Sequence, residues 1–256
     1  LQHIETEDFS SEILVFARNS LTGSTDSASA AFKKLGKIAK VFDYRLNILI
    51  GIFLNIFFLW DILQSIRLER WKKMHAQTLT QWFDALALVD ELCSFAGFDF
   101  LQADSVFPQI STKDFFIDGE ELKHPFIVPE KCVGNPVRFT DWKQFQIITG
   151  ANMAGKSTYL RTVGVNMVLA MAGSSVPAKR FVFSPVNIFT GIKTKDSLQD
   201  GESYFFAELK QLREIIVALQ SGKKVFIILD EILKGTNSAD KQNGSKALVK
   251  QLISLG

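Results

Sequence analysis

The chain has 256 residues, of which 47% are hydrophobic, so it can hold one sizeable domain with a packed core and a second, smaller one. Its formal net charge of +2 gives no sign of a strongly basic nucleic-acid surface. Two distant cysteines, Cys93 and Cys132, and histidines without metal-ligand spacing argue against a disulfide framework or a zinc site. We therefore expect a reducing, cytoplasmic compartment.

The first hundred residues are expected to form a helical region. Residues 19–29 are polar and rich in Ser, Thr and Gly, which predicts a loop. Residues 31–75 contain no proline and only two glycines, and this composition favours one or two long helices.

The centre of that helical region, residues 46–60, is strongly apolar. It is interrupted by Asn47 and Asn55 and falls short of the roughly 20 residues that cross a bilayer. We therefore predict a buried core helix, followed by a solvated basic stretch at residues 67–73. The alternative, in which an apolar run beside a basic one rests on a membrane surface, stays open.

Prolines divide residues 99–143 into short apolar runs. They are Pro108, Pro125, Pro129 and Pro136. This density excludes a helix and predicts short strands and loops. The change in pattern places a domain boundary near residue 100, with a helical segment at residues 1–100 and a second domain at residues 101–256.

The most informative segment starts at residue 150, where the sequence Gly-Ala-Asn-Met-Ala-Gly-Lys-Ser-Thr is a complete phosphate-loop motif. It lies between a predicted buried strand at residues 145–149 and a predicted helix at residues 158–171. The glycines let backbone N–H groups converge on a phosphate at a helix N-terminus. Lys156 is expected to reach the β- and γ-phosphates, and the Ser157 hydroxyl to bind Mg²⁺. The predicted ATP-binding residues are Gly150, Asn152, Gly155, Lys156, Ser157 and Thr158.

A second predicted strand, residues 225–229, is a continuous apolar run that ends in Asp230 and Glu231. Ligand sites in open α/β sheets lie at the carboxyl ends of the strands, so both carboxylates should share an edge with the glycine loop. Asp230 is predicted to hold the Mg²⁺ and Glu231 to deprotonate the attacking water.

Four stretches of the chain resemble the MutS family of DNA mismatch repair ATPases. They are residues 148–178 around the glycine loop, residues 188–192, residues 200–209 (Asp-Gly-Glu-Ser-Tyr-Phe-Phe-Ala-Glu-Leu) and residues 229–236 around the acidic pair. The pair His124-Pro125 and a helix at residues 82–95 extend the resemblance upstream, so it covers roughly residues 78–256. Ala151 and Ala154 replace the family's usual Pro and Gly, but neither position supplies a phosphate-binding side chain.

This resemblance implies an α/β P-loop ATPase domain of the ABC type with a mainly parallel sheet, preceded by part of a helical core or lever. It also implies a homodimer formed through the ATPase face, in which Ser203 is offered to the γ-phosphate held by the partner subunit. Locally, a plain helix cap explains Ser203 equally well, since a predicted helix starts at residue 204. Residues 133–137 would lie against the adenine or serve as structural filler.

The family's γ-phosphate-contacting histidine does not occur between Glu231 and Gly256, so we expect a piece of a longer protein that hydrolyses ATP weakly. Three functions follow as hypotheses. The first is an ATPase module that couples MgATP binding and hydrolysis to dimer closure and DNA binding. The second is a membrane-associated ABC-type energy-coupling ATPase, although the chain lacks the Leu-Ser-Gly-Gly-Gln signature of that class. The third is a non-catalytic, nucleotide-sensing dimerisation module.

Overall fold

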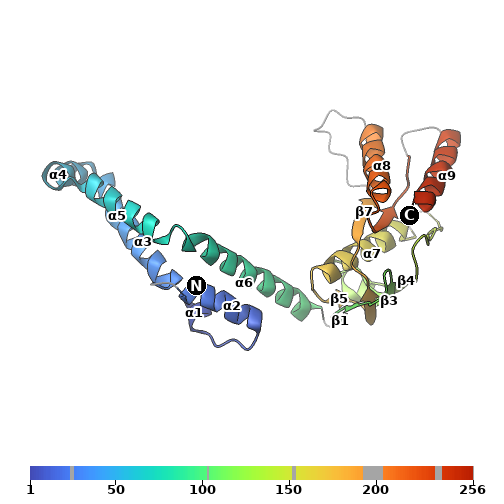
Figure 1. Ribbon diagram of the computed structural model, residues 1–256, viewed down its shortest axis with the longest axis horizontal. Coiled ribbons are helices and arrows are strands. Elements are labelled where there is room, and N and C mark those ends of the chain that lie inside the picture. Colours follow the sequence, from blue (N-terminus) through green and yellow to red (C-terminus); the bar gives the residue numbers. More distant parts are fainter. Residues whose placement is uncertain (24–25, 103, 152–153, 193–203, 234–237, 256) are drawn as a thin grey trace. The chain divides into compact units, whose positions relative to one another are not determined.

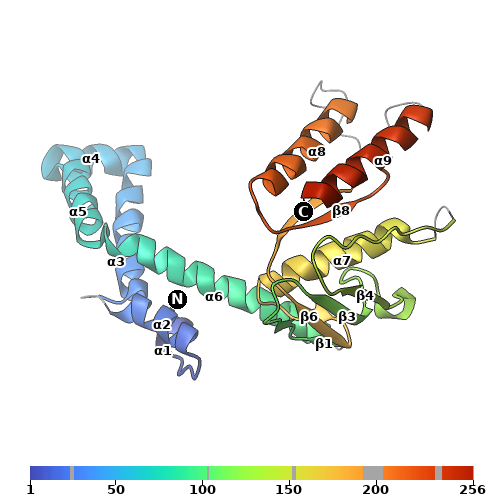
Figure 2. The ribbon, with the colours of Figure 1, turned by 45° about the vertical axis from the view of Figure 1, so that its right-hand side comes forward.

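The computed structural model describes residues 1–23, 26–102, 104–151, 154–192, 204–233 and 238–255. They form two compact units, residues 1–96 and residues 97–256. The described residues of the first unit contain helices only, and those of the second combine helices with short strands (Figures 1 and 2).

The helices of the first unit follow one another closely along the chain. They are α1 (Gln2–Thr6), α2 (Glu12–Thr22), α3 (Ala28–Phe42), the 3₁₀ helix η1 (Asp43–Leu46), α4 (Ile48–Phe58), α5 (Trp60–His75) and α6 (Thr78–Leu101), whose last residues belong to the second unit. Ser27 begins α3 because its side chain accepts a hydrogen bond from the Ala30 N–H. Helices α3 and α5 lie side by side, and α4 crosses the end of this hairpin (Figures 1 and 2).

Small and aromatic side chains form the core of the first unit. Ala28 and Ala31 on α3 leave room for two large rings, Trp71 of α5 and Trp82 of α6, and all four side chains are buried. The Trp71 Nε1–H donates a hydrogen bond to the Ala31 carbonyl oxygen at 2.9 Å. This core holds α3, α5 and α6 together, whereas Gly51 is the only buried residue of α4.

The helical region at residues 31–75 differs from the predicted one or two long helices, because the chain is redirected twice. Asn47 begins α4 by accepting a hydrogen bond from the Ile50 N–H, and Leu59 adopts a left-handed φ of 48° between α4 and α5. Three α-helices therefore replace one or two. The prediction of a buried core helix at residues 46–60 is also wrong, because most side chains of α4 are exposed.

In the second unit, short strands and helices are interspersed along the chain. They are β1 (Ser105–Val106), β2 (Gln109–Ile110), β3 (Ile117–Leu122), the 3₁₀ helix η2 (Pro129–Lys131), β4 (Asn135–Phe139), α7 (Lys156–Met171), β5 (Val176–Pro177), β6 (Arg180–Phe183), β7 (Asn187–Gly191), α8 (Tyr204–Gln220), β8 (Val225–Leu229) and α9 (Ser238–Leu255). The largest sheet has the order β2-β6-β3-β4, and only its β2–β6 pair is parallel. Strands β1 and β5 form an antiparallel pair, and β7 and β8 a parallel one.

The predicted α/β P-loop fold of the ABC type, with its mainly parallel sheet, is wrong. The described residues are mostly helical, and their strands form three small sheets of mixed direction. The apolar segment at residues 145–149, predicted as a buried strand, pairs with no described strand, and its Phe145, Ile147 and Ile148 side chains are exposed. The β7–β8 pair and the four-stranded sheet are separate sheets.

Helix α7 lies at the centre of the main core. Its Val163 and Met167 share one buried cluster with Phe181 of β6 and with Phe226 and Ile228 of β8. A second cluster joins the other face of β8 to α8 and α9. The elements that carry the glycine loop and the acidic pair therefore pack on one core.

Candidate nucleotide-binding site

The glycine loop leads directly into α7. Gly155, at a φ of +86°, is the N-cap of the helix, and this left-handed conformation favours glycine because it lacks a Cβ. Glycine offers no side chain to cap the helix, and the first backbone hydrogen bond of α7 runs from the Tyr159 N–H to the Gly155 carbonyl oxygen at 2.9 Å. The first N–H groups of a helix have no acceptor within it, so this end can accept an anion.

Lys156, the first residue of α7, holds its amine on the glycine loop. The Nζ atom donates hydrogen bonds to the carbonyl oxygens of Gly150 at 2.6 Å and of Ala151 at 2.8 Å. The ammonium group therefore lies beside the open helix end. Ser157 and Thr158 follow in the same first turn, whereas Asn152 lies outside the described residues.

Tyr159 attaches the first turn of α7 to strand β4. Its hydroxyl donates a hydrogen bond to the Pro136 carbonyl oxygen at 3.1 Å, and burial raises the pKa of this phenol. The contact brings the segment at residues 133–137 next to the start of α7.

The acidic pair follows β8 at a sharp turn. The Asp230 N–H donates to the Gly191 carbonyl oxygen at 3.0 Å, which extends the parallel β7–β8 pairing by one residue. Glu231 and Leu233 then adopt left-handed φ values of 49° and 58°. Such conformations cost free energy in residues other than glycine and persist only where neighbouring contacts hold them, often at functional sites.

One of those contacts comes from Glu208 of α8, a residue to which the sequence analysis assigned no role. Its Oε1 atom accepts a hydrogen bond from the Leu233 N–H at 2.5 Å. Its Oε2 atom is buried and has no hydrogen-bond partner among the described residues. The only signal in the sequence is that Glu208 is the one charged residue of the apolar stretch at residues 204–209.

The structure places the two predicted halves of the site on one core but does not join them directly. A Cβ atom built on Gly164 of α7 would lie 3.2 Å from the Ile228 Cδ1 atom of β8, so the two elements are in close contact. Among the described residues, no hydrogen bond or ion pair connects Lys156 with Asp230. Ser203, the residue predicted to face a partner subunit, lies outside the described residues.

Comparison with known proteins gives relatives for this part of the chain. Residues 146–255 match the family model of MutS domain V. The chain is 35% identical over 188 residues to the DNA mismatch repair protein MutS of Thermotoga neapolitana, covering 72% of this chain and 23% of that protein. It is 34% identical over 188 residues to MutS protein homolog 4 of Mus musculus, covering 71% of this chain and 19% of that protein.

A third relative is the DNA mismatch repair protein MutS of Chlorobium chlorochromatii. It is 36% identical over 183 residues, which cover 66% of this chain and 20% of that protein. The chain therefore spans about a fifth of the length of the curated relatives it matches.

Proposed function

The chain belongs to the MutS family, and from that premise we propose that its second unit binds MgATP at the glycine loop and hydrolyses it. The observation that carries this proposal is the open N-terminus of α7, which begins directly after the loop with the Lys156 amine beside it. An uncapped helix start and a lysine are together a suitable receptor for a polyphosphate.

The phosphates would bind to the backbone N–H groups between Gly150 and Thr158, those of Asn152 and Gly155 included. The partial positive charge of the helix end favours them there. Lys156 would exchange its two bonds to loop carbonyl oxygens for bonds to phosphate oxygens. Those new bonds join two charged groups and are therefore stronger than the ones they replace.

The Mg²⁺ would be held by Ser157 and Asp230 together with phosphate oxygens and waters. Among the described residues, no group of three or more His, Cys, Asp or Glu side chains could hold a metal ion. That finding fits Mg²⁺, which proteins commonly bind through one or two side chains and the phosphates of the substrate. The ion would supply charge neutralisation at the phosphate oxygens.

Glu231 would act as the general base. Its carboxylate takes the proton of the attacking water while the water oxygen bonds to the γ-phosphorus, and the bond to the β–γ bridging oxygen breaks to release ADP. The left-handed turn at Glu231 and the bond from Leu233 to Glu208 support this role because they restrict the backbone that carries the carboxylate.

The longer protein would act as a homodimer on DNA, in which Ser203 faces the γ-phosphate held by the partner subunit. Residues 133–137 would lie against the adenine, and the bond from Tyr159 to Pro136 supports this placement because it brings the segment next to α7. The names of two relatives, DNA mismatch repair protein MutS, support DNA as the partner. The helices of residues 1–96 would transmit the nucleotide state to the DNA-binding parts.

A pair of substitutions tests this function. Lys156→Ala should raise the Kd for MgATP at least about tenfold in a calorimetric titration, because charge-assisted bonds to phosphate are lost. Lys246→Ala, which removes an exposed lysine of α9, should leave the Kd unchanged. An unchanged Kd for Lys156→Ala would mean that the site is assigned wrongly.

Glu231→Gln separates binding from hydrolysis. It should keep the affinity for ATP and reduce phosphate release by about a hundredfold or more, because the amide cannot take a proton from water. If the unsubstituted chain binds ATP and releases no phosphate under any condition that promotes dimers, the nucleotide-sensing dimerisation module becomes the better description.

A further inference from the structure

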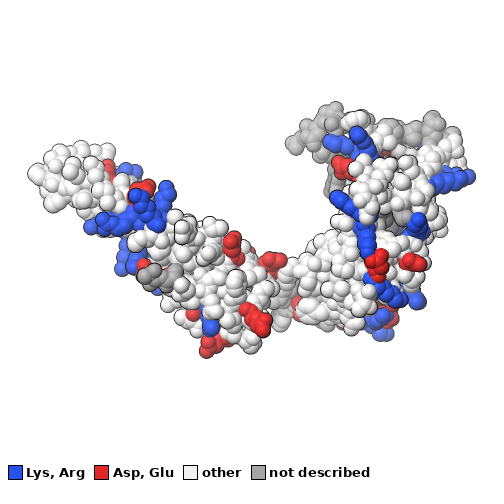
Figure 3. Space-filling view, viewed as in Figure 1, with Lys and Arg blue, Asp and Glu red and all other residues white. Residues whose placement is uncertain are grey.

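Helix α4 presents an apolar surface that no described part of the chain covers. The side chains that form it are exposed: Leu46, Ile48, Leu49, Ile50, Ile52, Phe53, Ile56, Phe57, Phe58 and Leu59. This group, the apolar tip, forms the uncharged end of the first unit in the space-filling view (Figure 3). Large exposed apolar patches mark interaction sites on protein surfaces.

The apolar tip covers most of the circumference of α4, and only the face with the buried Gly51 and the half-buried Leu54 and Asn55 is turned to the hairpin. Successive helical residues are rotated by about 100°, so the side chains of Ile48, Leu49 and Ile50 already cover three directions, and those of residues 52–58 repeat the pattern. A protein that docks on one face of a helix needs only one apolar stripe. No charged residue occurs at residues 46–60, so the tip is suited to an apolar medium that encloses it.

Two polar residues, Asn47 and Asn55, lie among the residues of the tip, and both side chains form local hydrogen bonds. The Asn47 Oδ1 atom accepts from the Ile50 N–H at 3.4 Å. The Asn55 amide donates to the Gly51 carbonyl oxygen at 3.1 Å and accepts from the Asp61 N–H at 3.0 Å. Since an unpartnered polar group is costly in hydrocarbon, these local bonds lower the free-energy cost of moving the tip out of water.

Aromatic residues and then basic residues border the tip. Tyr44 precedes it and Trp60 follows it, and the Trp60 Nε1–H donates to the Val41 carbonyl oxygen at 3.3 Å. Exposed basic side chains flank the tip on both sides in the sequence, and we name them the basic collar: Lys37, Lys40, Arg45, Arg67, Arg70, Lys72 and Lys73. Blue side chains mark part of this collar next to the tip in Figure 3. Tyr and Trp favour membrane interfaces, and clustered basic residues favour anionic headgroups.

The positive charge of the chain is concentrated in this hairpin. Residues 33–73 contain nine basic and three acidic side chains, an excess of six, whereas the whole chain has a net charge of +2. The remaining residues are therefore net negative by four. An anionic surface would attract the chain through the collar and orient the tip towards itself.

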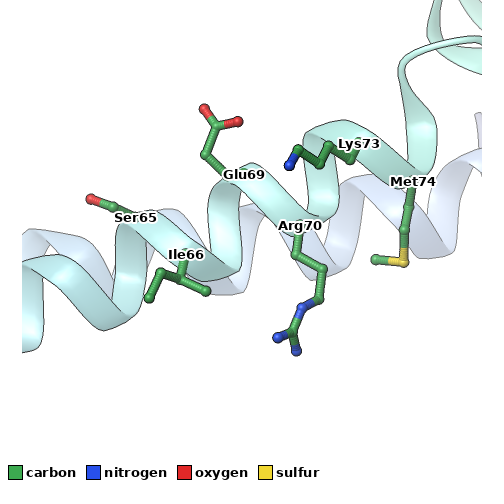
Figure 4. Close-up of a pocket in the computed structure, with 6 residues that line it drawn as sticks. All are labelled: Ser65, Ile66, Glu69, Arg70, Lys73 and Met74. Carbon is green, nitrogen blue, oxygen red and sulfur yellow. The ribbon is translucent and has the colours of Figure 1, made fainter.

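A shallow hollow lies within the collar on the surface of α5 (Figure 4). It is lined by Ser65, Ile66, Glu69, Arg70, Lys73 and Met74. Arg70 and Lys73 form no ion pair among the described residues, and Figure 4 shows the Arg70 side chain pointing away from the helix. Two cations on one side of α5 are suited to an anionic group at the membrane surface.

The geometry of α4 fits a helix that lies in the plane of a membrane. In the part of the chain that the structure describes, no single helix has both the length and the apolarity to cross a bilayer. One pair, residues 28–46 with Ile48–Phe58, meets both criteria together but is bent by 109°. With 11 residues, α4 is about 16 Å long, about half the thickness of the hydrocarbon core.

We propose that the apolar tip inserts into one leaflet of a membrane with anionic lipids, with the nearest cations of the basic collar at the phosphates and the others above the anionic surface. Helix α4 lies flat below the headgroups, and α3 and α5 rise from the surface. The interaction does not depend on the nucleotide site.

Flotation of the full chain with lipid vesicles tests the proposal. Vesicles of phosphatidylcholine and phosphatidylglycerol should carry the chain upward in a density gradient. With vesicles of phosphatidylcholine alone, the fraction of the chain that floats should be lower by about tenfold or more. Raising the salt concentration from about 0.1 M to about 0.5 M should weaken the binding, because dissolved ions screen the exposed charges of the collar. Failure to float with either vesicle would overturn the proposal.

Matched substitutions locate the contact. Phe57→Ser should lower the partition coefficient about tenfold or more, whereas Phe16→Ser on α2 should not change it, although the two side chains are 65% and 67% exposed. The double substitution Arg70→Glu and Lys73→Glu should lower it to a similar degree, and Lys250→Glu on α9 should not. Helical circular dichroism confirms that each variant is folded.

Tryptophan fluorescence tests how deeply the tip enters the membrane. Lipids brominated in the acyl chains should quench the full chain more than the Trp60→Phe variant, because Trp60 borders the inserted helix. Self-association that needs no lipid and disappears in Phe57→Ser would overturn the proposal and identify a second copy of the chain as the occupant.

Discussion

Two apolar runs in this chain, residues 46–59 and residues 225–229, meet opposite environments. Ile48 of α4 is 75% exposed, and Ile228 of β8 is 3% exposed. Strand β8 is covered on both faces, since Phe226 and Ile228 join the core of α7 and the alternate residues join that of α8 and α9. Helix α4 lies at the end of the α3–α5 hairpin, where no described helix covers it. Burial of an apolar run is favourable, but the run itself does not specify which surface covers it.

The two runs end in similar ways. Leu59 adopts a left-handed conformation after α4, and the Asn55 side chain of that helix bonds the backbone beyond the turn, at Asp61. Glu231 and Leu233 adopt left-handed conformations after β8, and the Glu208 side chain bonds the Leu233 N–H. The first turn orients an exposed tip, and the second orients the proposed catalytic carboxylate.

The largest expected effect is the difference in stability lost when a side chain is truncated in the buried run and in the exposed run. Ile228→Ala should lower the free energy of unfolding of the second unit by about 2–5 kcal/mol, because it leaves a cavity between α7 and β8. Ile56→Ala in α4 should change the stability of the first unit by less than about 0.5 kcal/mol. Urea titrations followed by circular dichroism measure both. Equal losses would show that α4 is buried in solution.

A smaller effect, on ATP turnover, is expected from substitutions at the turns that follow the two runs. Glu208→Ala should reduce ATP turnover by about tenfold with little change in ATP affinity, because the backbone that carries Glu231 loses a hydrogen bond. Glu208→Gln should restore most of the turnover, since its amide oxygen can accept the same N–H. Asn55→Ala, the matched loss at the other turn, should leave turnover unchanged. A Glu208→Ala enzyme with normal turnover would remove the positioning role.

The smallest expected effect concerns His124, which lies before β4 in the second unit. Burial, followed by the positive charge of Arg161, lowers the pKa of His124, and its Nδ1 atom accepts a hydrogen bond from the Phe126 N–H at 3.2 Å, as only a neutral ring can. The unfolded chain therefore binds the proton more readily. Stability contributed by the neutral ring is present above about pH 6.5 and is lost as the pH falls below it.

Thermal midpoints between about pH 7.5 and about pH 5.5 measure this loss, with both pH values chosen to bracket the histidine pKa of about 6.5. We expect a fall smaller than that caused by Ile228→Ala. The variant His124→Gln should show a flatter profile over the same range. A midpoint that rises on acidification would contradict a lowered pKa for His124 in the folded chain.

Local patterns predicted much of the second unit. The helix predicted at residues 158–171 is confirmed by α7, the helix predicted to start at residue 204 by α8, and the strand predicted at residues 225–229 by β8. The short strands and loops predicted for residues 99–143 are also confirmed. These elements depend on periodicity, caps and turn residues that neighbours in the sequence supply. The roles of Lys156, Ser157, Asp230 and Glu231 stay predictions, and Asn152 and Ser203 lie outside the described residues.

The sequence by itself determined the family of this chain, the glycine loop that opens α7 and the acidic pair that follows β8, because each is encoded by a few adjacent residues. Only the tertiary structure decided that residues 145–149 do not form a central strand, that α4 is exposed and that Glu208 holds the turn after β8. Burial, strand pairing and the partner of a buried carboxylate depend on segments distant in the chain, and composition or spacing within one segment cannot specify them.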